Sequence, residues 1–468
     1  MATNVISNSA YKGDSSVLPA TNAPMPNNAS LYLDFQSGLY IGKDISTGSV
    51  TRSTLISDLL VFSRTTVKSV IGIDGLIRQA ASGELAIQYD AVTKSRLGCT
   101  IHNSSANLAI YSEDFSQTSW TKTGVTTTAA AAIAPDGNSS ATLVSDGSAT
   151  SAHTIEETTA TATTTGNYLA FSIYVKPGTA RYVQLYALAT LSGSTYANFD
   201  LQTGRCVKMS ANAVQAGITA EPNGFYRLSL SIKVFATYSA GGAGIAFINN
   251  APGSTMQPSY TGTGLTAYVW GGQLEVREAP TPYMVTSGAS FTRSLDVLNA
   301  NVSTINFLSL TAGTVFVEAY MPSVNQSPAG VMILGNAFFG LENTDGSANY
   351  LFFTQKPLTT NNGSVQVSSY VSPSSSSMNT KHNVAPAGKL YRGMVSFDAS
   401  DIITYDDFGS TESAISTAVS HFGRLLIGRG HGTGNSTALP FNGTIKRIIY
   451  FPSKLTISQM SAFYNSMV

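Results

Sequence analysis

The sequence predicts an all-β protein, in which a small N-terminal β module precedes two β-sandwich (jelly-roll) domains and one short C-terminal helix. The segment 268–276 alternates large apolar and polar residues, which is the period of a strand with one buried face, and short runs such as 168–175 and 225–232 are also expected to be strands. Turn residues separate these runs, and Asp74 followed by Gly75 predicts a hairpin with a type I′ turn. No long stretch has the 3.6-residue period of a helix. This combination is typical of two-sheet sandwiches.

Length and composition limit the classes of function. A chain of 468 residues predicts roughly two to four domains. Charged residues make up only 11%, against roughly 25% in a typical soluble protein, so hydroxyl and amide groups must form much of the surface. The 26 basic and 26 acidic residues cancel, which argues against nucleic acid as a partner. Apolar runs are shorter than the ~20 residues that span a bilayer, so no membrane insertion is expected.

A proline-containing segment marks the main boundary. The alternation over 268–276 predicts the last strand of a domain, with one face in a core. Pro280 and Pro282 lack backbone donors and fix φ, so a central strand cannot continue through them. We expect a docking arm over 1–29, a small β module over 30–106, a carbohydrate-binding-like jelly roll over 107–285 and a second sandwich over 286–468. A disordered tail is the alternative for the arm, which has few aliphatic residues.

Several single residues have an expected structural role. Thr456 followed by Gln459 predicts a capping box at the start of the C-terminal helix. Cys99 and Cys206 have no paired spacing and are expected to be free thiols rather than a disulfide. Trp120 and Trp270 are expected to fill a core, with a sugar-stacking platform as the alternative.

The sequence contains no motif typical of a catalytic or cofactor site. The adjacent acidic pairs at 156–157 and 406–407 would point to opposite faces of a strand, so they are poor acid/base partners. The histidines lack the spacing of a metal site; they are His102, His153, His382, His421 and His431. We therefore expect no catalytic residue, no metal, no cofactor and no enzymatic activity.

The loop over 428–436 is the most unusual local sequence. Its glycines would let backbone amides approach a ligand. Arg429, His431 and Asn435 would supply hydrogen-bond donors, and they are the candidate ligand-binding residues. The alternative is a flexible hairpin connection without a ligand.

Short patches along the chain resemble bacteriophage tail-fibre and receptor-binding virion proteins. The order of the patches carries the resemblance, which covers residues 31–468 in pieces. One departure lies at 99–103, where Cys-Thr-Ile-His-Asn stands in place of the family's Leu-Ile-Glu. The patches are Asp74-Gly-Leu-Ile-Arg-Gln-Ala80, Ile87-Gln-Tyr-Asp90, Asn107-Leu-Ala-Ile-Tyr-Ser112, Gly272-Gln-Leu-Glu275, Pro282-Tyr283, Thr292-Arg-Ser-Leu-Asp296 and Asn442-Gly-Thr-Ile445.

The resemblance implies a fold and a function. The final domain would be a laminin-G or concanavalin-A-like sandwich, and the chain would be a virion protein of a tail fibre or tail tip. Its arm would dock to other virion proteins, its sandwiches would bind host-surface carbohydrate, and it would form a homotrimer whose several weak contacts add up. The alternatives are a capsid head fibre or decoration protein without a specific ligand, and a polysaccharide depolymerase.

Overall fold

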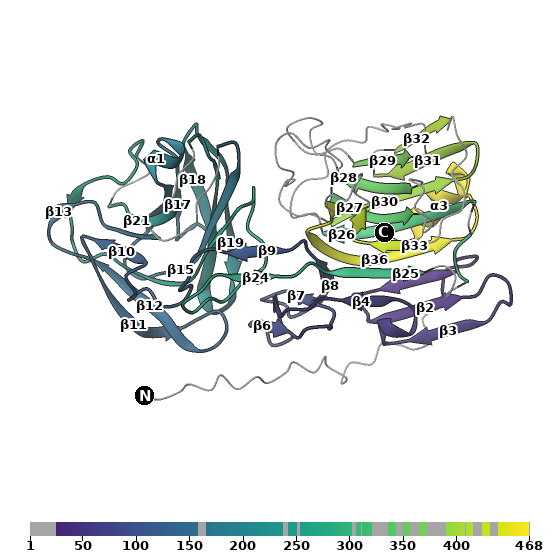
Figure 1. The fold of residues 1–468 in the computed structure, drawn as a ribbon, viewed down its shortest axis with the longest axis horizontal. Helices are drawn as coiled ribbons and strands as arrows, with labels where there is room; N and C mark the ends of the chain where they lie inside the picture. The colour runs from purple at the N-terminus through teal and green to yellow at the C-terminus, as the bar shows by residue number, and fades with distance from the viewer. Residues whose placement is uncertain are drawn as a thin grey trace.

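The computed structural model has two lobes built almost entirely of antiparallel strands, which confirms the predicted fold class (Figure 1). One four-residue helix, α1 (Ala189–Ser192), was not expected from the sequence. No helix among the described residues is long and apolar enough to cross a membrane. The structure describes residues 25–157, 165–236, 242–249, 253–301, 306–309, 311–320, 336–342, 350–355, 365–370, 390–407, 409–414, 424–430 and 439–467.

The jelly-roll lobe, on the left in Figure 1, consists of two six-stranded sheets that enclose an apolar core. The first sheet has the order β10 (Trp120–Thr123), β14 (Thr154–Glu157), β21 (Ala243–Phe247), β16 (Tyr182–Ala187), β17 (Tyr196–Asp200) and β18 (Arg205–Met209). The second has the order β11 (Val125–Ile133), β12 (Ser139–Asp146), β23 (Thr266–Glu275), β15 (Tyr168–Pro177), β20 (Phe225–Lys233) and β19 (Ala213–Glu221). A short pair, β13 (Thr150–Ser151) and β22 (Tyr260–Thr261), lies outside both sheets.

The sandwich lobe, on the right in Figure 1, has a second core between a ten-stranded and a six-stranded sheet. The larger sheet has the order β3 (Val50–Ser53), β2 (Leu39–Lys43), β1 (Leu31–Asp34), β36 (Gly443–Phe451), β26 (Gly313–Tyr320), β30 (Leu390–Phe397), β31 (Asp401–Asp406) and β32 (Gly409–Ala414), while β8 (Arg96–Ile101) pairs with β36 and β7 (Ile87–Tyr89). The smaller has the order β29 (Val365–Tyr370), β28 (Tyr350–Gln355), β27 (Asn336–Glu342), β33 (Arg424–Ile427), β25 (Val297–Asn301) and β4 (Val61–Ser63).

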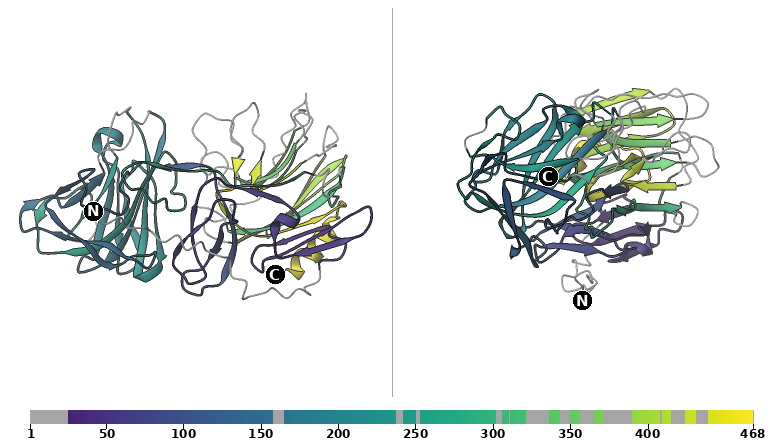
Figure 2. Two further views of the ribbon diagram at one scale, coloured as in Figure 1. Left: turned by 60° about the horizontal axis from the view of Figure 1, so that its bottom comes forward. Right: turned by 60° about the vertical axis from the view of Figure 1, so that its left-hand side comes forward.

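Strands from the two ends of the chain share both sheets of the sandwich lobe. β1 pairs with β36 in a register that places Leu33 opposite Ile448, and β8 pairs with the start of β36. In the other sheet, β4 pairs with β25. This pairing differs from the expectation of a separate β module over 30–106, because these strands bury their apolar faces against the C-terminal half. Figure 2 shows the purple strands continuing the series of green and yellow strands. The domain limits themselves stay a prediction.

The chain passes between the lobes twice, along two adjacent strands. β9 (Ser105–Asn107) leads into the jelly-roll lobe and β24 (Phe291–Arg293) leads out of it. These strands pair with each other, with Asn107 opposite Phe291. The jelly roll is therefore an insertion in the sandwich lobe.

Apolar packing holds the lobes together. The hairpin of β5 (Lys68–Ile71) and β6 (Ile77–Ala80) places Ile71 and Ile77 in one cluster with Tyr174 and Trp270 of the jelly-roll lobe. Strand β23 is consequently buried on both faces, and not on one as expected, because the hairpin covers its outer face. Trp270 belongs to this junction cluster and Trp120 to the jelly-roll core, so both tryptophans fill cores.

Among the local predictions, the capping box and the free cysteines are confirmed, whereas the turn type is wrong. Helix α3 (Ile457–Ser466) begins with the expected capping box of Thr456 and Gln459. Cys99 and Cys206 are free. The β5–β6 hairpin forms as predicted, but of the two predicted turn residues only Gly75 has a positive φ (78°), so the turn is not of type I′.

Candidate functional site

A pocket of about 380 Å³ lies where the hairpin, the jelly-roll lobe and the sandwich lobe meet. Its volume is in the range of small-molecule sites. We call it the junction pocket. Its walls combine aliphatic and aromatic side chains with a few polar ones; they are Ser69, Val70, Ile71, Ile77, Gln88, Leu97, Thr100, His102, Tyr174, Glu221, Arg227, Pro280, Thr281, Pro282, Tyr283, Tyr320, Gly443 and Thr444.

Arg227 supplies a fixed positive charge to the junction pocket. It projects from β20 and lies over the ring of Tyr174, with its Cζ 5.4 Å from the ring centre. Its Nη2 donates to Ser172 Oγ at 3.0 Å and to the carbonyl of Thr281 at 2.9 Å. Its Nε is buried and has no hydrogen-bond partner. Since a buried N–H without a partner is costly, a ligand that accepts from Nε would satisfy it.

Glu221 ends β19 on the same side of the junction pocket. Burial raises the pKa of its carboxyl to about 7, although the nearby Arg227 opposes the rise. The group therefore changes charge close to neutral pH. Protonated, it can donate a hydrogen bond to a ligand; ionised, it can only accept.

His102 follows β8 and also lines the junction pocket. It is only 9% exposed, and its Nδ1 has no partner. Burial, together with the positive charges of Lys68 and Arg293, lowers the pKa of the imidazole well below its ordinary value. The ring is therefore neutral at physiological pH and offers one donor and one acceptor.

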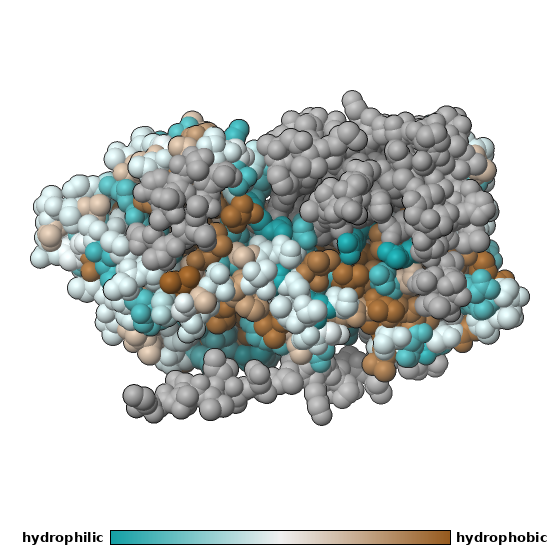
Figure 3. All heavy atoms as spheres, viewed as in Figure 1, coloured by the Kyte–Doolittle hydropathy of each residue, from teal (hydrophilic) through white to brown (hydrophobic). Residues whose placement is uncertain are grey.

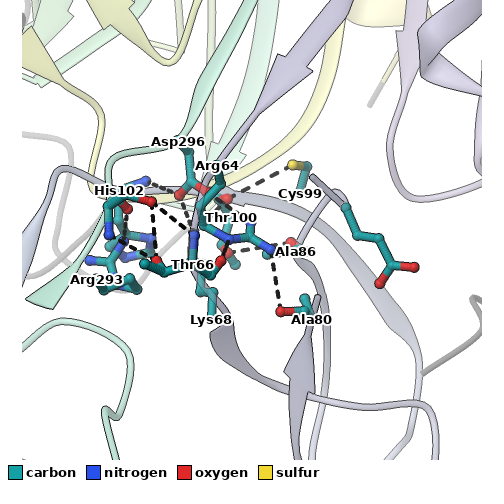
Figure 4. A network of polar contacts seen from close by, with 12 residues as sticks. Arg64, Thr66, Lys68, Ala80, Ala86, Cys99, Thr100, His102, Arg293 and Asp296 are labelled. Atoms are coloured by element: carbon teal, nitrogen blue, oxygen red, sulfur yellow. Dashed lines mark hydrogen bonds and ion pairs between the residues drawn. The ribbon is translucent and has the colours of Figure 1, made fainter. Parts of the chain in front are cut away.

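Behind His102 lies a fully buried ionic group, the Asp296 cluster, formed by Asp296, Arg64 and Lys68 (Figure 4). Asp296 accepts from Arg64 Nη1 at 3.0 Å, from Lys68 Nζ at 2.6 Å and from the backbone N–H of His102 at 2.8 Å. Lys68 Nζ also donates to the carbonyl of Thr100. The cluster therefore fixes the backbone at His102 and Thr100, which both line the junction pocket.

In the Asp296 cluster, burial and ion pairing shift the pKa of each group in opposite directions. Burial lowers the pKa of Lys68 to about 8, and the charge of Asp296 limits the fall. For Asp296 burial alone would raise the pKa, but the combined attraction of Lys68 and Arg64 outweighs it and the pKa is lowered. Both groups are thus charged at neutral pH, as a buried pair with good geometry requires.

Two buried side chains hold the proline-containing wall. Glu275 accepts from the Thr281 N–H at 2.7 Å, the Thr281 hydroxyl at 2.6 Å and Ser105 Oγ at 2.7 Å. Asn107 Nδ2 donates to the carbonyls of Gly272 and Met284, while its Oδ1 accepts from the N–H groups of Leu274 and Ala109. These bonds join the segments 105–109 and 272–284, which contain three of the sequence patches.

The residues that the sequence suggested for ligand binding lie elsewhere. Arg429 is half-buried in β34 (Arg429–Gly430), which pairs with β35 (Leu439–Pro440). It does not line the junction pocket. His431 and Asn435 lie outside the described residues. Gly428 has a φ of 65°, and a Cβ there would lie 2.7 Å from a side-chain carbon of Ile101, so this glycine is required for packing.

Sequence reasoning missed the three polar groups of the junction pocket. His102 had been grouped with the scattered histidines, whereas Glu221 and Arg227 carried no motif. One signal was present, because His102 belongs to the segment that departs from the family pattern.

The adjacent pair Glu156 and Glu157 does face opposite ways, since Glu156 is half-buried and accepts from the Tyr186 hydroxyl while Glu157 is fully buried. In the part of the chain that the structure describes, no group of acidic, histidine or cysteine side chains could hold a metal.

Comparisons with known proteins found weak structural similarity and no sequence match. No protein-family model and no curated protein sequence matches it. Among solved structures it is similar to Trypanosoma rangeli sialidase in complex with the inhibitor DANA, at 10% identity and a TM-score of 0.25, over 69% of this chain and 60% of the sialidase. It is also similar to domains LG4-5 of the mouse laminin alpha1 chain, at 11% identity and a TM-score of 0.20, over 64% and 86% of the two chains.

The sialidase matches correct one expectation. We had expected no enzymatic activity, yet three sialidase complexes other than the first are also similar, including one with sialic acid at 9% identity and a TM-score of 0.24. The expectation of a non-enzyme is therefore withdrawn. The chain spans about three fifths of the sialidases' length, and at this level of similarity no catalytic residue or substrate is transferred from them.

Proposed function

We propose that the chain binds a saccharide in the junction pocket and serves as a host-attachment protein of a bacteriophage virion. The observation that carries the binding proposal is a pocket of about 380 Å³ lined by Arg227 and His102, two residues that each have a buried ring or guanidinium nitrogen without a hydrogen-bond partner. A sugar ring offers hydroxyls that donate or accept, together with apolar C–H faces. The pocket supplies the matching groups, with Ile71, Pro282 and Tyr320 as apolar or aromatic wall.

The low share of charged residues agrees with recognition of a ligand through hydroxyl, amide and aromatic groups. On the face shown in Figure 3, most of the jelly-roll lobe is of intermediate hydropathy, while hydrophobic residues gather near the junction and over the sandwich lobe. Only 11% of residues are charged. Recognition by hydroxyls, amides and a few rings is weak for one site, so the proposal includes several copies, a homotrimer, whose contacts add up.

The place in a virion rests on the sequence patches alone. Several of those patches lie near the lobe junction, where the Tyr283 carbonyl accepts from the Ser69 hydroxyl of the hairpin and Asp296 pairs with Lys68. The feature shared with those virion proteins would thus be the contact by which one domain is attached to another. A role of the N-terminal arm in docking to other virion proteins belongs to the same proposal.

The test is binding of the fluorescent full-length chain to an array of bacterial surface glycans. We expect at least one glycan class to bind, and Arg227→Gln to weaken that binding at least tenfold. Arg205→Gln, on an exposed position of β18, is the matched control and should bind as the wild type does. Tyr320→Phe is a second variant of the pocket wall and removes only one hydroxyl. It tests the pocket by a smaller change in case Arg227→Gln fails to fold.

Five outcomes would overturn parts of the proposal. If no glycan binds, or if both arginine variants behave alike, the junction pocket is not the saccharide site. Release of free sugar during the incubation would replace binding by hydrolysis. Immunogold labelling of phage particles with an antibody against the chain tests its location: label at the tail supports attachment, label on the head favours a decoration protein, and unlabelled particles contradict a virion role.

A further inference from the structure

Two arginines at the junction pocket have no carboxylate at contact distance. Arg227, on the pocket wall, donates to one hydroxyl and one carbonyl, which are both uncharged. Arg293 is fully buried and donates to the carbonyl of Asn103, the residue after His102, and to one further carbonyl. Neither guanidinium forms an ion pair with another described residue. Since arginine is always charged, two positive charges lie here without a counter-ion.

The Asp296 cluster adds to this excess of positive charge. In the cluster a single carboxylate, Asp296, pairs with two cations, Arg64 and Lys68, and all three side chains are fully buried. Water cannot screen charges at such depth as it does at a surface. The cluster holds the backbone N–H of His102, so its surplus charge lies directly behind the pocket wall.

His102 reports the sign of the electrostatic field at that wall. Burial lowers the pKa of its imidazole well below the ordinary value, and four cations lower it further; they are Lys68, Arg293, Arg277 and Arg227. Each of them disfavours one more positive charge at this position. The same field favours a negative charge on a ligand beside His102.

Glu221 does not cancel the charge of Arg227. It is the one carboxylate among the residues that line the pocket. Burial raises the pKa of this carboxyl to about 7, and the attraction of Arg227 only limits the rise. Near neutral pH the group is therefore ionised for only part of the time.

Another part of the pocket wall has the opposite character. Burial raises the pKa of the Tyr320 hydroxyl, and the carboxylates Glu318 and Asp90 raise it further, whereas Arg392 opposes the rise. This part suits the hydroxyl donors of a ligand better than an acid group. The positive part of the pocket is thus confined to Arg227 and His102.

We propose that the saccharide bound in the junction pocket is an acidic one, and that its carboxylate lies against Arg227. This inference rests on the proposed function, because it names the ligand class of the same pocket. Arg227 Nη1 donates to no described residue, so it is available to a carboxylate as a charged donor. The Tyr174 ring and the bonds made by Nη2 hold the guanidinium in place before a ligand arrives.

The test compares uronic-acid oligosaccharides with the same oligosaccharides after reduction of each carboxylate to a primary alcohol. Binding of the fluorescently labelled sugars to the full-length chain is measured by anisotropy near neutral pH. We expect at least one acidic oligosaccharide to bind at least tenfold more tightly than its reduced form. Arg227→Gln should abolish this preference, whereas the control Arg205→Gln, at an exposed position, should keep it.

A second variant guards against a folding defect in Arg227→Gln. Glu221→Gln removes the negative charge beside Arg227, so it should strengthen the preference for the acidic form at least threefold. A misfolded pocket cannot produce this gain. If Glu221→Gln weakens binding of the acidic form, or if Arg227→Gln keeps the preference, the carboxylate does not lie against Arg227 and the inference is wrong.

The outcomes separate this inference from the proposed function. If acidic and reduced oligosaccharides bind equally, or if only neutral members of the glycan array bind and do so through Arg227, the pocket is a saccharide site but the acidic class is wrong. If no sugar of either kind binds, the saccharide site itself is wrong and this inference fails with it.

Discussion

Lys68 Nζ lies 2.6 Å from Asp296 Oδ2, although 228 residues separate the two in sequence. The predicted jelly roll, 107–285, lies within that interval. This ion pair, fully buried on both sides, therefore closes the loop from which the jelly-roll lobe extends. It lies next to the paired strands β9 and β24, which carry the chain across the junction.

Asp296→Asn should destabilise the chain by about 3–5 kcal/mol, because it leaves Arg64 and Lys68 charged and buried without a counter-ion. Urea unfolding, followed by circular dichroism, measures the loss. Asp74→Asn is the control: its pair with Arg78 is exposed and should be worth less than about 1 kcal/mol. Equal losses in the two variants would mean that the Asp296 cluster contributes no more than a surface pair.

Gly272→Ala should destabilise the jelly-roll lobe by about 1–3 kcal/mol through overpacking. A Cβ at this position would lie 2.7 Å from ring carbons of Trp120, which is itself only 1% exposed. Gly253→Ala adds the same methyl where no atom lies within 4 Å, and it should be nearly neutral. Differential scanning calorimetry compares the two; a neutral Gly272→Ala would mean that the Trp120 ring can move.

Asn107→Asp should cost about 2–4 kcal/mol at neutral pH, because an amide that donates to two buried carbonyls becomes an acceptor. The remaining oxygen would still accept from the N–H groups of Leu274 and Ala109, so the loss isolates the two donated bonds. Asn212→Asp, at an exposed position, is the control. A Tm for Asn107→Asp that equals the control's would contradict the assigned role of Asn107.

The stability contribution of Glu221 should depend on pH. Its pKa of about 7 in the folded chain exceeds the ordinary value of 4.5, so between these values the folded state holds a proton that the unfolded state releases. Stability from this group is therefore complete below pH 4.5 and is lost as pH rises through 7. Glu221→Gln should be more stable than the wild type by about 1–2 kcal/mol at pH 8, and the difference should shrink toward pH 5. A difference that stays constant over this range would exclude the raised pKa.

Local features could be predicted from the sequence because neighbouring residues decide them. The capping box of Thr456 and Gln459 and the end of a strand before Pro280 each depend on a few adjacent positions. The Asp296 cluster could not be predicted in this way, since a buried charge and an exposed one look alike in sequence. Only the register of β4 against β25 brings Arg64 to Asp296.

The junction pocket depends on the same long-range register. Glu221 and Arg227 come from one edge of the jelly roll, whereas His102 directly follows β8 of the sandwich lobe. The glycine-rich loop drew attention because its sequence is unusual, but its first residue, Gly428, is required for packing against Ile101. An unusual local sequence indicated a backbone requirement there.

The insertion of the jelly roll has a consequence for synthesis on the ribosome. Strand β1 needs β36 as a neighbour, and β36 begins at Gly443, so β1 must wait for almost the whole chain to be made. The inserted jelly roll has all its strands in one continuous stretch and can fold first. During that delay β1 and β8 lack β36, and β4 lacks β25, although β1, β2 and β3 can pair with one another, so the exposed apolar edges and faces are open to misassociation. A chaperone that holds this first segment, or slow translation after the jelly roll, would therefore decide the yield of folded protein.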